Sequence, residues 1–118
     1  MPAPVRKTVE EQARGGRIRG VGAEVEDGTT VYEAELVVNG RKRDVRIDEA
    51  GTVLEIEEEL PVGELPEKVK AAATQAGRIL KAESVTKDGK IVCYEIDVKA
   101  RGKKSELKLS PEGERIER

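Results

Sequence analysis

Apolar and polar residues alternate along much of this chain, which is the pattern of β-strands with one buried face. The stretch VYEAELVV at 31–38 alternates in this way, and so does VCYEIDV at 92–98. Asp27-Gly28, Asn39-Gly40 and Asp88-Gly89 adjoin these stretches. Such pairs are typical of two-residue hairpin turns, in which both residues need a positive φ. The pattern therefore predicts short antiparallel strands joined by tight turns.

Two further segments have apolar residues at three- and four-residue spacing, which predicts amphipathic helices. The second begins at Pro66, because proline is favoured in the first helical turn, and ends at Gly77. The two apolar stripes are Val5, Val9 and Ala13, then Leu65, Val69, Ala72 or Ala73, and Ala76. Both helices are short, so they are expected to dock on the strands.

The chain contains one structural unit twice. Tyr32-Glu33 recurs as Tyr94-Glu95, each inside an alternating run and after an Asp-Gly turn. We predict two tandem α-β-β-β-β repeats at about 2–59 and 65–118, with 60–64 as the linker. Together they are expected to form one α+β domain, an antiparallel sheet with two helices packed on one face.

The buried face of this sheet is expected to hold the tyrosines and branched residues of both repeats. These are Tyr32, Leu36, Val38, Val45, Ile47, Leu54 and Ile56, with Tyr94, Ile96, Val98, Leu107, Leu109 and Ile116 as counterparts. A chain of 118 residues has room for one domain with one core.

Charge and composition exclude several function classes. The net charge of −2 hides an acidic middle, since residues 23–65 carry thirteen Asp and Glu against four Lys and Arg. Mixed charges elsewhere, and two tyrosines as the only aromatic residues, predict no nucleic-acid binding. No apolar run approaches the roughly 20 residues of a membrane-spanning helix, so no membrane insertion is expected.

The residues that carry most enzyme chemistry are missing. The sequence has no histidine and one cysteine, Cys93, which excludes a catalytic triad, an imidazole metal ligand and an internal disulfide. In EIEEEL, Glu55 and Glu57 share one strand face while Glu58 lies on the other, so no turn gathers them around a cation. The glycines of 15–22 follow a helix and precede a strand, the reverse of a phosphate loop, and predict a helix stop and a bulged or flexible strand start. We predict a protein that is not an enzyme and has no cofactor and no metal.

The sheet face opposite the helices is the candidate binding surface for a protein partner. Its residues are Val31, Glu33, Glu35, Val37, Cys93, Glu95 and Asp97. The competing interpretation is a solubilising ladder in which the acids pair with Lys42, Arg46, Lys104 and Lys108 on facing strands. A second function hypothesis is a structural domain that self-associates, through a sheet edge or this face, with no separate ligand. A monomer and a homodimer both fit the sequence.

Two stretches carry a resemblance to a known family. VYEAELVVNGRKRDVRIDEAGTVLEIEEEL and LPEKVKAA with its following GRILKAESVTKDGKIVCYEIDV resemble PepSY-like units, which run helix, DG…YEV, hairpin and DxxGxVLEIE. The resemblance implies a layout similar to tandem-repeat proteins that inhibit β-lactamases, and a role in binding or restraining a partner such as a hydrolase. This chain differs from such inhibitors because it has no tryptophan and no phenylalanine, which many tight inhibitory surfaces use.

The resemblance also bears on location. PepSY-like domains are usually exported, which implies a periplasmic or secreted protein if an N-terminal signal was trimmed. The first residues, MPAPVRKTVEEQ, lack the apolar stretch of such a signal. Without a trimmed signal, the expectation is a cytoplasmic protein.

Overall fold

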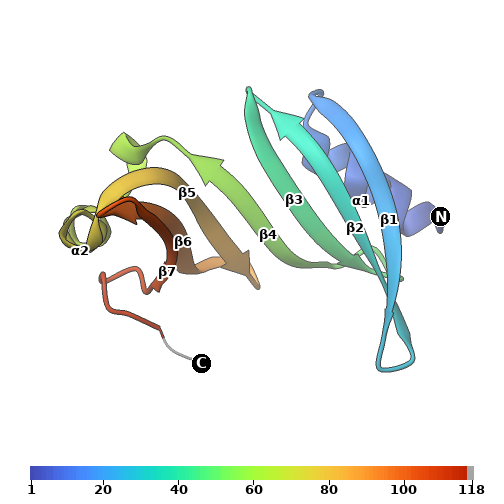
Figure 1. Ribbon diagram of the computed structural model, residues 1–118. Helices are drawn as coiled ribbons and strands as arrows, with labels where there is room; N and C mark the ends of the chain where they lie inside the picture. The colour runs from blue at the N-terminus through green and yellow to red at the C-terminus, as the bar shows by residue number, and fades with distance from the viewer. Residues whose placement is uncertain (117–118) are drawn as a thin grey trace. The chain divides into compact units, whose positions relative to one another are not determined.

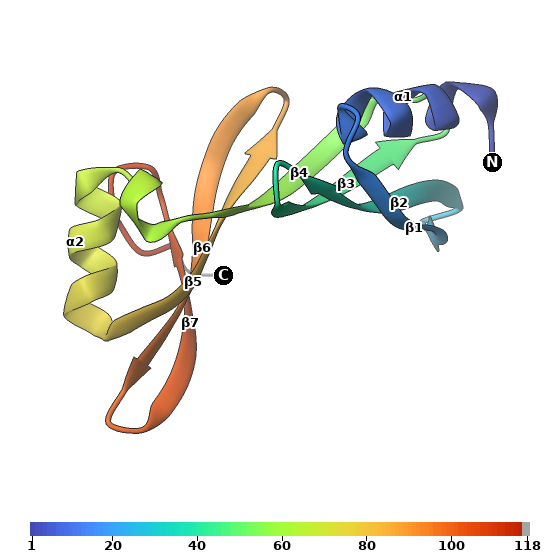
Figure 2. The same cartoon turned by 90° about the horizontal axis from the view of Figure 1, so that it is seen from above.

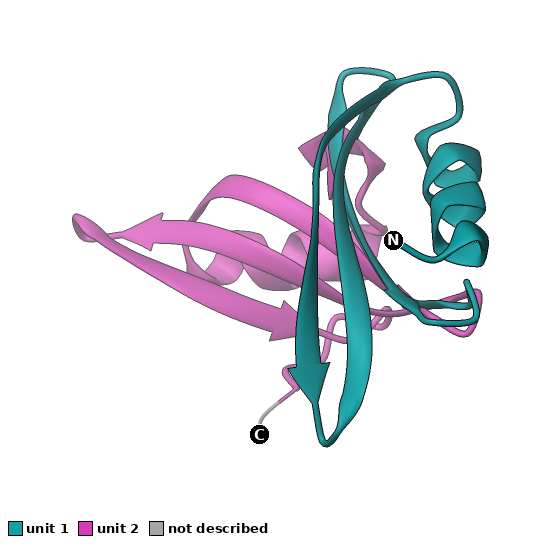
Figure 3. Ribbon diagram, turned by 90° about the vertical axis from the view of Figure 1, so that its right-hand side faces the viewer, with its two compact units in different colours: residues 1–58 teal, residues 59–118 magenta. Residues whose placement is uncertain are grey.

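The computed structural model describes residues 1–116. These residues form two compact units that divide after Glu58 (Figure 3). The described residues contain two α-helices, one short 3-10 helix and seven β-strands, all paired antiparallel where register is defined. The predicted α+β class is confirmed. That the two repeats behave as one domain stays a prediction.

Unit 1 has one helix and four strands. They are α1 (Ala3–Ala13), β1 (Arg17–Glu26), β2 (Thr29–Val38), β3 (Arg41–Asp48) and β4 (Val53–Leu60). Each strand pairs with the next along the chain, so the unit is a simple meander. Helix α1 lies across one face of these strands and packs mainly on β2 and β3 (Figure 1). The opposite face carries no helix of this unit.

Unit 2 repeats the plan with one strand fewer. It contains η1 (Val62–Glu64), α2 (Glu67–Ala76), β5 (Arg78–Lys87), β6 (Lys90–Ala100) and β7 (Lys103–Leu109). Helix α2 packs on β5 and β6 (Figure 2).

Of the fourth strand predicted for the second repeat, the described residues up to 116 show a single bridge, between Leu109 and Arg115. The first repeat has the apolar residues of TVLEIEEEL at this point, whereas the second has the charged ERIER, which offers little to bury.

The tight turns have the backbone that the sequence predicts. Both residues have positive φ in the three predicted turns, Asp27-Gly28, Asn39-Gly40 and Asp88-Gly89, and also in Arg101-Gly102, with values from 51° to 78°. The right-handed twist of paired strands favours this geometry in two-residue hairpins. These four turns fix which strands are neighbours within each unit.

Most buried apolar side chains of the described residues form two clusters, one in each unit, and not the single core predicted. Each helix supplies the stripe expected of it, since Val5, Val9 and Ala13 are buried in unit 1 and Leu65, Val69 and Ala73 in unit 2. Leu36, Val38, Val45, Ile47, Tyr94, Ile96, Val98, Leu107 and Leu109 are buried as predicted, while Tyr32 and Ile56 are half-buried. Each helix covers its own strands, and this gives each unit its own core.

Two residues predicted to be inward are exposed, Leu54 at 38% and Ile116 at 37%. The register of β3 with β4 shifts between Arg46 and Ile47, which pair with Glu55 and Val53. Leu54 is therefore the extra residue of a β-bulge, and Val53 takes the inward position. Ile116 follows the bridge of Arg115 with Leu109, and its N–H donates to the carbonyl of Lys108 on β7, which places it beside Lys108 and not beside the inward Leu107 and Leu109.

Glycines at equivalent places in the two repeats allow close backbone packing. Gly51 has a φ of 88°, and a Cβ there would lie 2.6 Å from the carbonyl oxygen of Pro4 at the start of α1. Gly113 has a φ of 85°, and a Cβ there would lie 2.5 Å from the carbonyl oxygen of Lys68 in α2. In both units, the loop after the third strand thus packs closely against the first turn of the helix.

A buried arginine ties α1 to the sheet of unit 1. The Arg43 side chain is 8% exposed and lies on the helix-facing side of β3. Its Nη1 donates to Glu58 Oε2 at 2.6 Å, and its Nη2 donates to Gln12 Oε1 at 2.7 Å. Without the register, a charged residue at an inward strand position, such as Arg43, cannot be told from an outward one.

Candidate functional site

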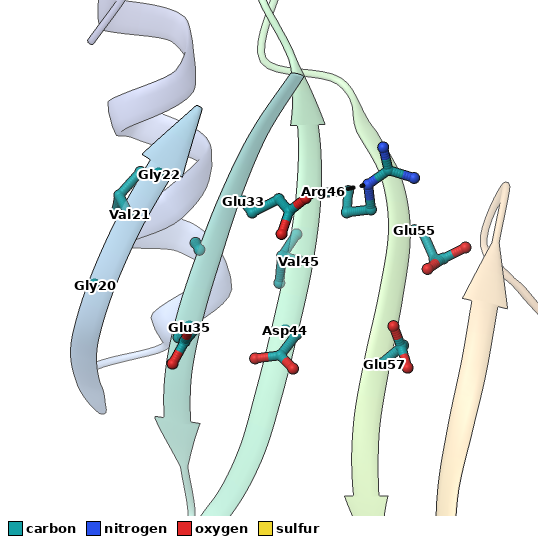
Figure 4. A pocket seen from close by; sticks show the side chains of 11 residues that line it. Gly20, Val21, Gly22, Glu33, Glu35, Asp44, Val45, Arg46, Glu55 and Glu57 are labelled. Atoms are coloured by element: carbon teal, nitrogen blue, oxygen red, sulfur yellow. Dashed lines mark ion pairs between the residues drawn. The ribbon is translucent and has the colours of Figure 1, made fainter. Parts of the chain in front are cut away.

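A hollow of about 430 Å³ lies on the sheet of unit 1, and side chains on the face opposite α1 surround it (Figure 4). Strands β1 to β4 all contribute to its lining. The polar side chains that line it are Glu33, Glu35, Asp44, Arg46, Glu55 and Glu57. Five carboxylates and one guanidinium make this lining strongly acidic.

Two glycines on β1 create the depth of the hollow. Gly20 pairs with Glu35 and Gly22 pairs with Glu33, so both glycines lie on the face that carries the carboxylates. A Cβ built on either would meet no atom within 4 Å, so both positions border open space. The predicted bulged start of this strand is confirmed, since the register shifts between Ile18 and Gly20.

The strands place three carboxylates directly opposite one another in one row. Glu35 of β2 pairs with Asp44 of β3, and Asp44 pairs with Glu57 of β4. Like charges at directly opposed positions of a sheet disfavour the fold. Lys42 Nζ lies 3.7 Å from Asp44 Oδ2 and offsets part of this negative charge. We call Glu35, Asp44 and Glu57 the acidic row.

The neighbouring row alternates in sign. Arg46 stands between Glu33 and Glu55 in the register, and its Nη2 also donates to Glu26 Oε2 at 2.5 Å. Its Nε lies 4.0 Å from Glu33 Oε1. The pKa of Arg46 is raised, chiefly by the hydrogen bond to Glu26. Arg46 is therefore held by Glu26 and Glu33.

The acidic surface continues along β1 beyond the hollow. Glu24 lies near Glu33 and Glu26, and its pKa is raised, first by the negative charge of Glu33 and then by hydrogen bonds to the two neighbouring carboxyl groups. A raised carboxyl pKa reports a local excess of negative charge. This end of the face is therefore also suited to a positively charged partner.

The structure brings only some of the predicted site residues together. Glu33 and Glu35 line the hollow, and Val37 follows them on β2, half-buried. Glu95 and Asp97 lie on β6 of unit 2, half-buried. These four acids are thus two pairs, one in each unit.

Val31 and Cys93 are corrections to the predicted face, because they are only 5% and 3% exposed. Val31 stands between Glu24 and Asp48 in the register of unit 1. Cys93 pairs with Val85 across β5 and β6, and both are buried. Since Tyr94 is buried as well, both faces of β6 are covered at this point. Neither Val31 nor Cys93 offers its side chain to a partner.

The competing interpretation, a solubilising ladder, holds for part of the face. Arg46 faces Glu33 and Lys108 faces Glu95 as predicted, and Lys104 Nζ lies 3.7 Å from Asp97 Oδ2. Glu35, however, faces Asp44 and not Lys42, which is paired in the register with Val37. The ladder thus accounts for one row of unit 1 and for Glu95 with Lys108 in unit 2. The register also sets acids opposite one another in both units, Glu35 beside Asp44 in unit 1 and Asp97 beside Glu106 in unit 2.

The second repeat differs from the first at the two glycines. By the shared pairing with Tyr-Glu, Gly20 corresponds to Lys81, which pairs with Asp97, and Gly22 corresponds to Glu83, which pairs with Glu95. Both strands have their bulge at this same place. Side chains therefore stand in unit 2 where unit 1 has an opening. This difference was not predicted, because in the sequence alone the glycines indicate only a helix stop and a bulged or flexible strand start.

No helix in the described part of the chain is long and apolar enough to cross a membrane.

No protein-family model matches the chain, and no curated protein matches it. Solved structures match over nearly its full length. A DUF2874 family protein from Bacteroides ovatus is 19% identical with a TM-score of 0.73, covering 99% of this chain and 86% of that one. A BLIP-like protein from Bacteroides fragilis is 19% identical with a TM-score of 0.69, covering 99% and 84%. A candidate periplasmic protein from Bacteroides eggerthii is 18% identical with a TM-score of 0.76, covering 98% and 86%.

These likenesses show the fold. The chain has the fold of the DUF2874 family and BLIP-like proteins. The PepSY-like name given from the sequence stays a prediction.

Proposed function

We propose that this protein is a non-catalytic binding module that uses the acidic hollow of unit 1 to hold a basic segment of a protein partner. The acidic row of Glu35, Asp44 and Glu57 carries the proposal. Three opposed carboxylates disfavour the fold, so a positively charged ligand is a reason for their presence. A lysine or arginine side chain entering over Gly20 and Gly22 would meet them.

The kind of partner follows from the chemistry of the lining. Arginine and lysine side chains bring donors that carboxylates accept, and opposite surface potentials speed encounter and exclude acidic partners. The BLIP-like neighbour and the PepSY-like resemblance support a partner of the hydrolase class and an inhibitory outcome. The candidate periplasmic neighbour supports a periplasmic or secreted location. Glu95 and Asp97 of unit 2 remain candidates for a second contact region.

The second repeat supplies the variant that tests the hollow. In Gly20→Lys/Gly22→Glu, unit 1 receives the side chains that unit 2 has at these places, with no change of net charge. Both positions border open space, so the fold is expected to accept them. A second variant, Glu35→Gln/Glu57→Gln, keeps the hollow open and removes two charges. Its control is Glu10→Gln/Glu11→Gln on the exposed side of α1, which removes the same charge.

The assay is affinity capture from an extract of the source organism, followed by measurement of the captured protein against each variant by calorimetry. We expect wild type and control to bind alike, and each hollow variant to bind at least about tenfold more weakly. Retention of full affinity in both hollow variants, with folding verified by circular dichroism, would contradict the proposal.

A further inference from the structure

Strand β1 is an exposed edge of the sheet in unit 1. It pairs with β2 along one side, and no strand among residues 1–116 pairs with its other side. All ten of its residues, Arg17–Glu26, are exposed. An edge strand of this length presents unpaired backbone N–H and C=O groups that can join another strand.

One face of β1 carries apolar side chains that its own unit leaves uncovered. The register places Ile18, Val21, Ala23 and Val25 on the side of α1, opposite Leu36, Ala34, Tyr32 and Thr30 of β2. Ile18, Val21 and Val25 are 43%, 40% and 74% exposed, because α1 packs mainly on β2 and β3. Burying this row against another strand would remove apolar area from water.

The charges of β1 are arranged so that the strand complements itself. Arg17 and Arg19 stand at its beginning, and Glu24 and Glu26 stand at its end. Two β1 strands running antiparallel place the arginines of each beside the glutamates of the other. A parallel pair, by contrast, would set like charges side by side, which is unfavourable.

The bulge at Arg19 is what makes this pairing consistent with the faces of the strand. Because the register skips Arg19, Arg17 and Glu26 share the face of the hollow, and Ile18 and Val25 share the face of α1. Antiparallel strands in one sheet require directly opposed residues to share a face. A two-fold axis at Gly22 meets this requirement at every pair.

We propose that two copies of this chain pair through β1, antiparallel and centred on Gly22. Arg17 then faces Glu26 of the second copy, Ile18 faces its Val25, and Val21 faces its Ala23. Arg19 and Gly20, the two residues of the bulge, lie opposite its Glu24. The interface is isologous, so each contact occurs twice.

The raised pKa of Glu24 and the arrangement of charges along β1 both agree with a second copy of the chain as the partner of this edge. The raised pKa of Glu24 reports an excess of negative charge, which the arginines of a second copy would relieve. Charged side chains, especially lysine, and prolines protect many edge strands from association. Here the two signs lie at opposite ends of β1, which favours one defined pairing. The self-association depends on the edge of β1, and the proposed partner binding depends on the hollow.

Charge reversal tests the pairing. Arg17→Glu/Arg19→Glu and Glu24→Lys/Glu26→Lys each place like charges opposite one another, and each alone should weaken the dimer at least about tenfold. An equimolar mixture should recover association as a heterodimer, because every facing pair is then opposite in sign. Arg6→Glu/Lys7→Glu, on the exposed side of α1, is the control with the same change of charge as the first variant.

The measurement is sedimentation velocity over a wide concentration range. We expect wild type and the control to dimerise, each reversal variant to be shifted towards monomer, and the mixture to recover. Val25→Lys should also weaken association without loss of folding, since Val25 is the most exposed of the row. A wild type that is monomeric throughout, or a dimer that both reversal variants leave unchanged, overturns the proposal.

Discussion

Replacing Gly51 by alanine tests how the loop after β3 seats the first turn of α1. Gly51 has a φ of 88°, and a Cβ there would lie 2.6 Å from the carbonyl oxygen of Pro4. Gly40 is the matched control, since it also has a positive φ, 76°, but its Cβ would meet no atom within 4 Å. The comparison separates the cost of the backbone conformation from the cost of the contact.

The expected losses follow from the two sites. An alanine held at positive φ costs about 1–2 kcal/mol, and this applies to Gly40→Ala and Gly51→Ala alike. At Gly51 the loop must also move away from Pro4, which disturbs the hydrogen bond that Thr8 Oγ1 donates to the Gly51 carbonyl at 2.6 Å. A hydrogen bond of this kind is worth about 1 kcal/mol. We therefore expect Gly51→Ala to lose about 2–4 kcal/mol, at least about 1 kcal/mol more than Gly40→Ala.

The assay is urea unfolding followed by far-ultraviolet circular dichroism, with the slope of the transition compared between variants. Gly113→Ala offers an independent repetition in unit 2, because its Cβ would lie 2.5 Å from the Lys68 carbonyl oxygen. Equal losses for Gly40→Ala and Gly51→Ala, within about 0.5 kcal/mol, would refute the argument that the loop and the helix are in tight contact.

Three further predictions concern single side chains of unit 1. Thr8→Val should cost about 1 kcal/mol in the same urea assay, because it removes the hydroxyl that donates to the carbonyls of Gly51 and Pro4. Glu58→Ala should cost about 2–3 kcal/mol because it removes the carboxylate that accepts from Arg43, a side chain only 8% exposed, and leaves the hydrogen bond to Gln12. A loss below 0.5 kcal/mol, roughly the error of the method, would contradict this. Glu24→Gln should raise the thermal midpoint at neutral pH, because the folded state holds the ionised Glu24 beside other carboxylates. As the pH falls through the raised pKa, folded wild type takes up the proton, so the difference should vanish below the ordinary glutamate range, and a difference independent of pH would count against it.

The helices, turns and inward residues could be predicted because each depends on neighbours in the sequence. The Asp27-Gly28 turn and the stripe through Val5 and Val9 are local patterns, and both are confirmed. Leu54 was predicted wrongly because a bulge changes which residues face inward, and a bulge depends on the partner strand. The burial of Val31 and Cys93 was missed because alternation assigns a side chain to a face without saying what covers it.

The hollow could not be predicted without the pairing register of the strands. Alternation correctly places Glu55 and Glu57 on one face of β4, but it does not say which residues of β3 stand beside them. The sequence therefore predicted that Lys42 would pair with the acids of β2, whereas the register sets Asp44 beside Glu35. The acidic row depends on three strands at once, and no local pattern contains it.

The two repeats provide a natural comparison between what the fold requires and what it does not. Gly51 and Gly113 occupy equivalent places, and in both a Cβ would meet the backbone of a helix, so the fold accounts for them. Gly20 and Gly22 have no such restraint, and their counterparts in unit 2 are Lys81 and Glu83 on a strand with the same bulge. Glycine within a strand costs about 0.5–1 kcal/mol relative to alanine. Since the fold accepts side chains at these two places, the glycines of unit 1 need another reason, and the opening that they leave beside the acidic row supplies one.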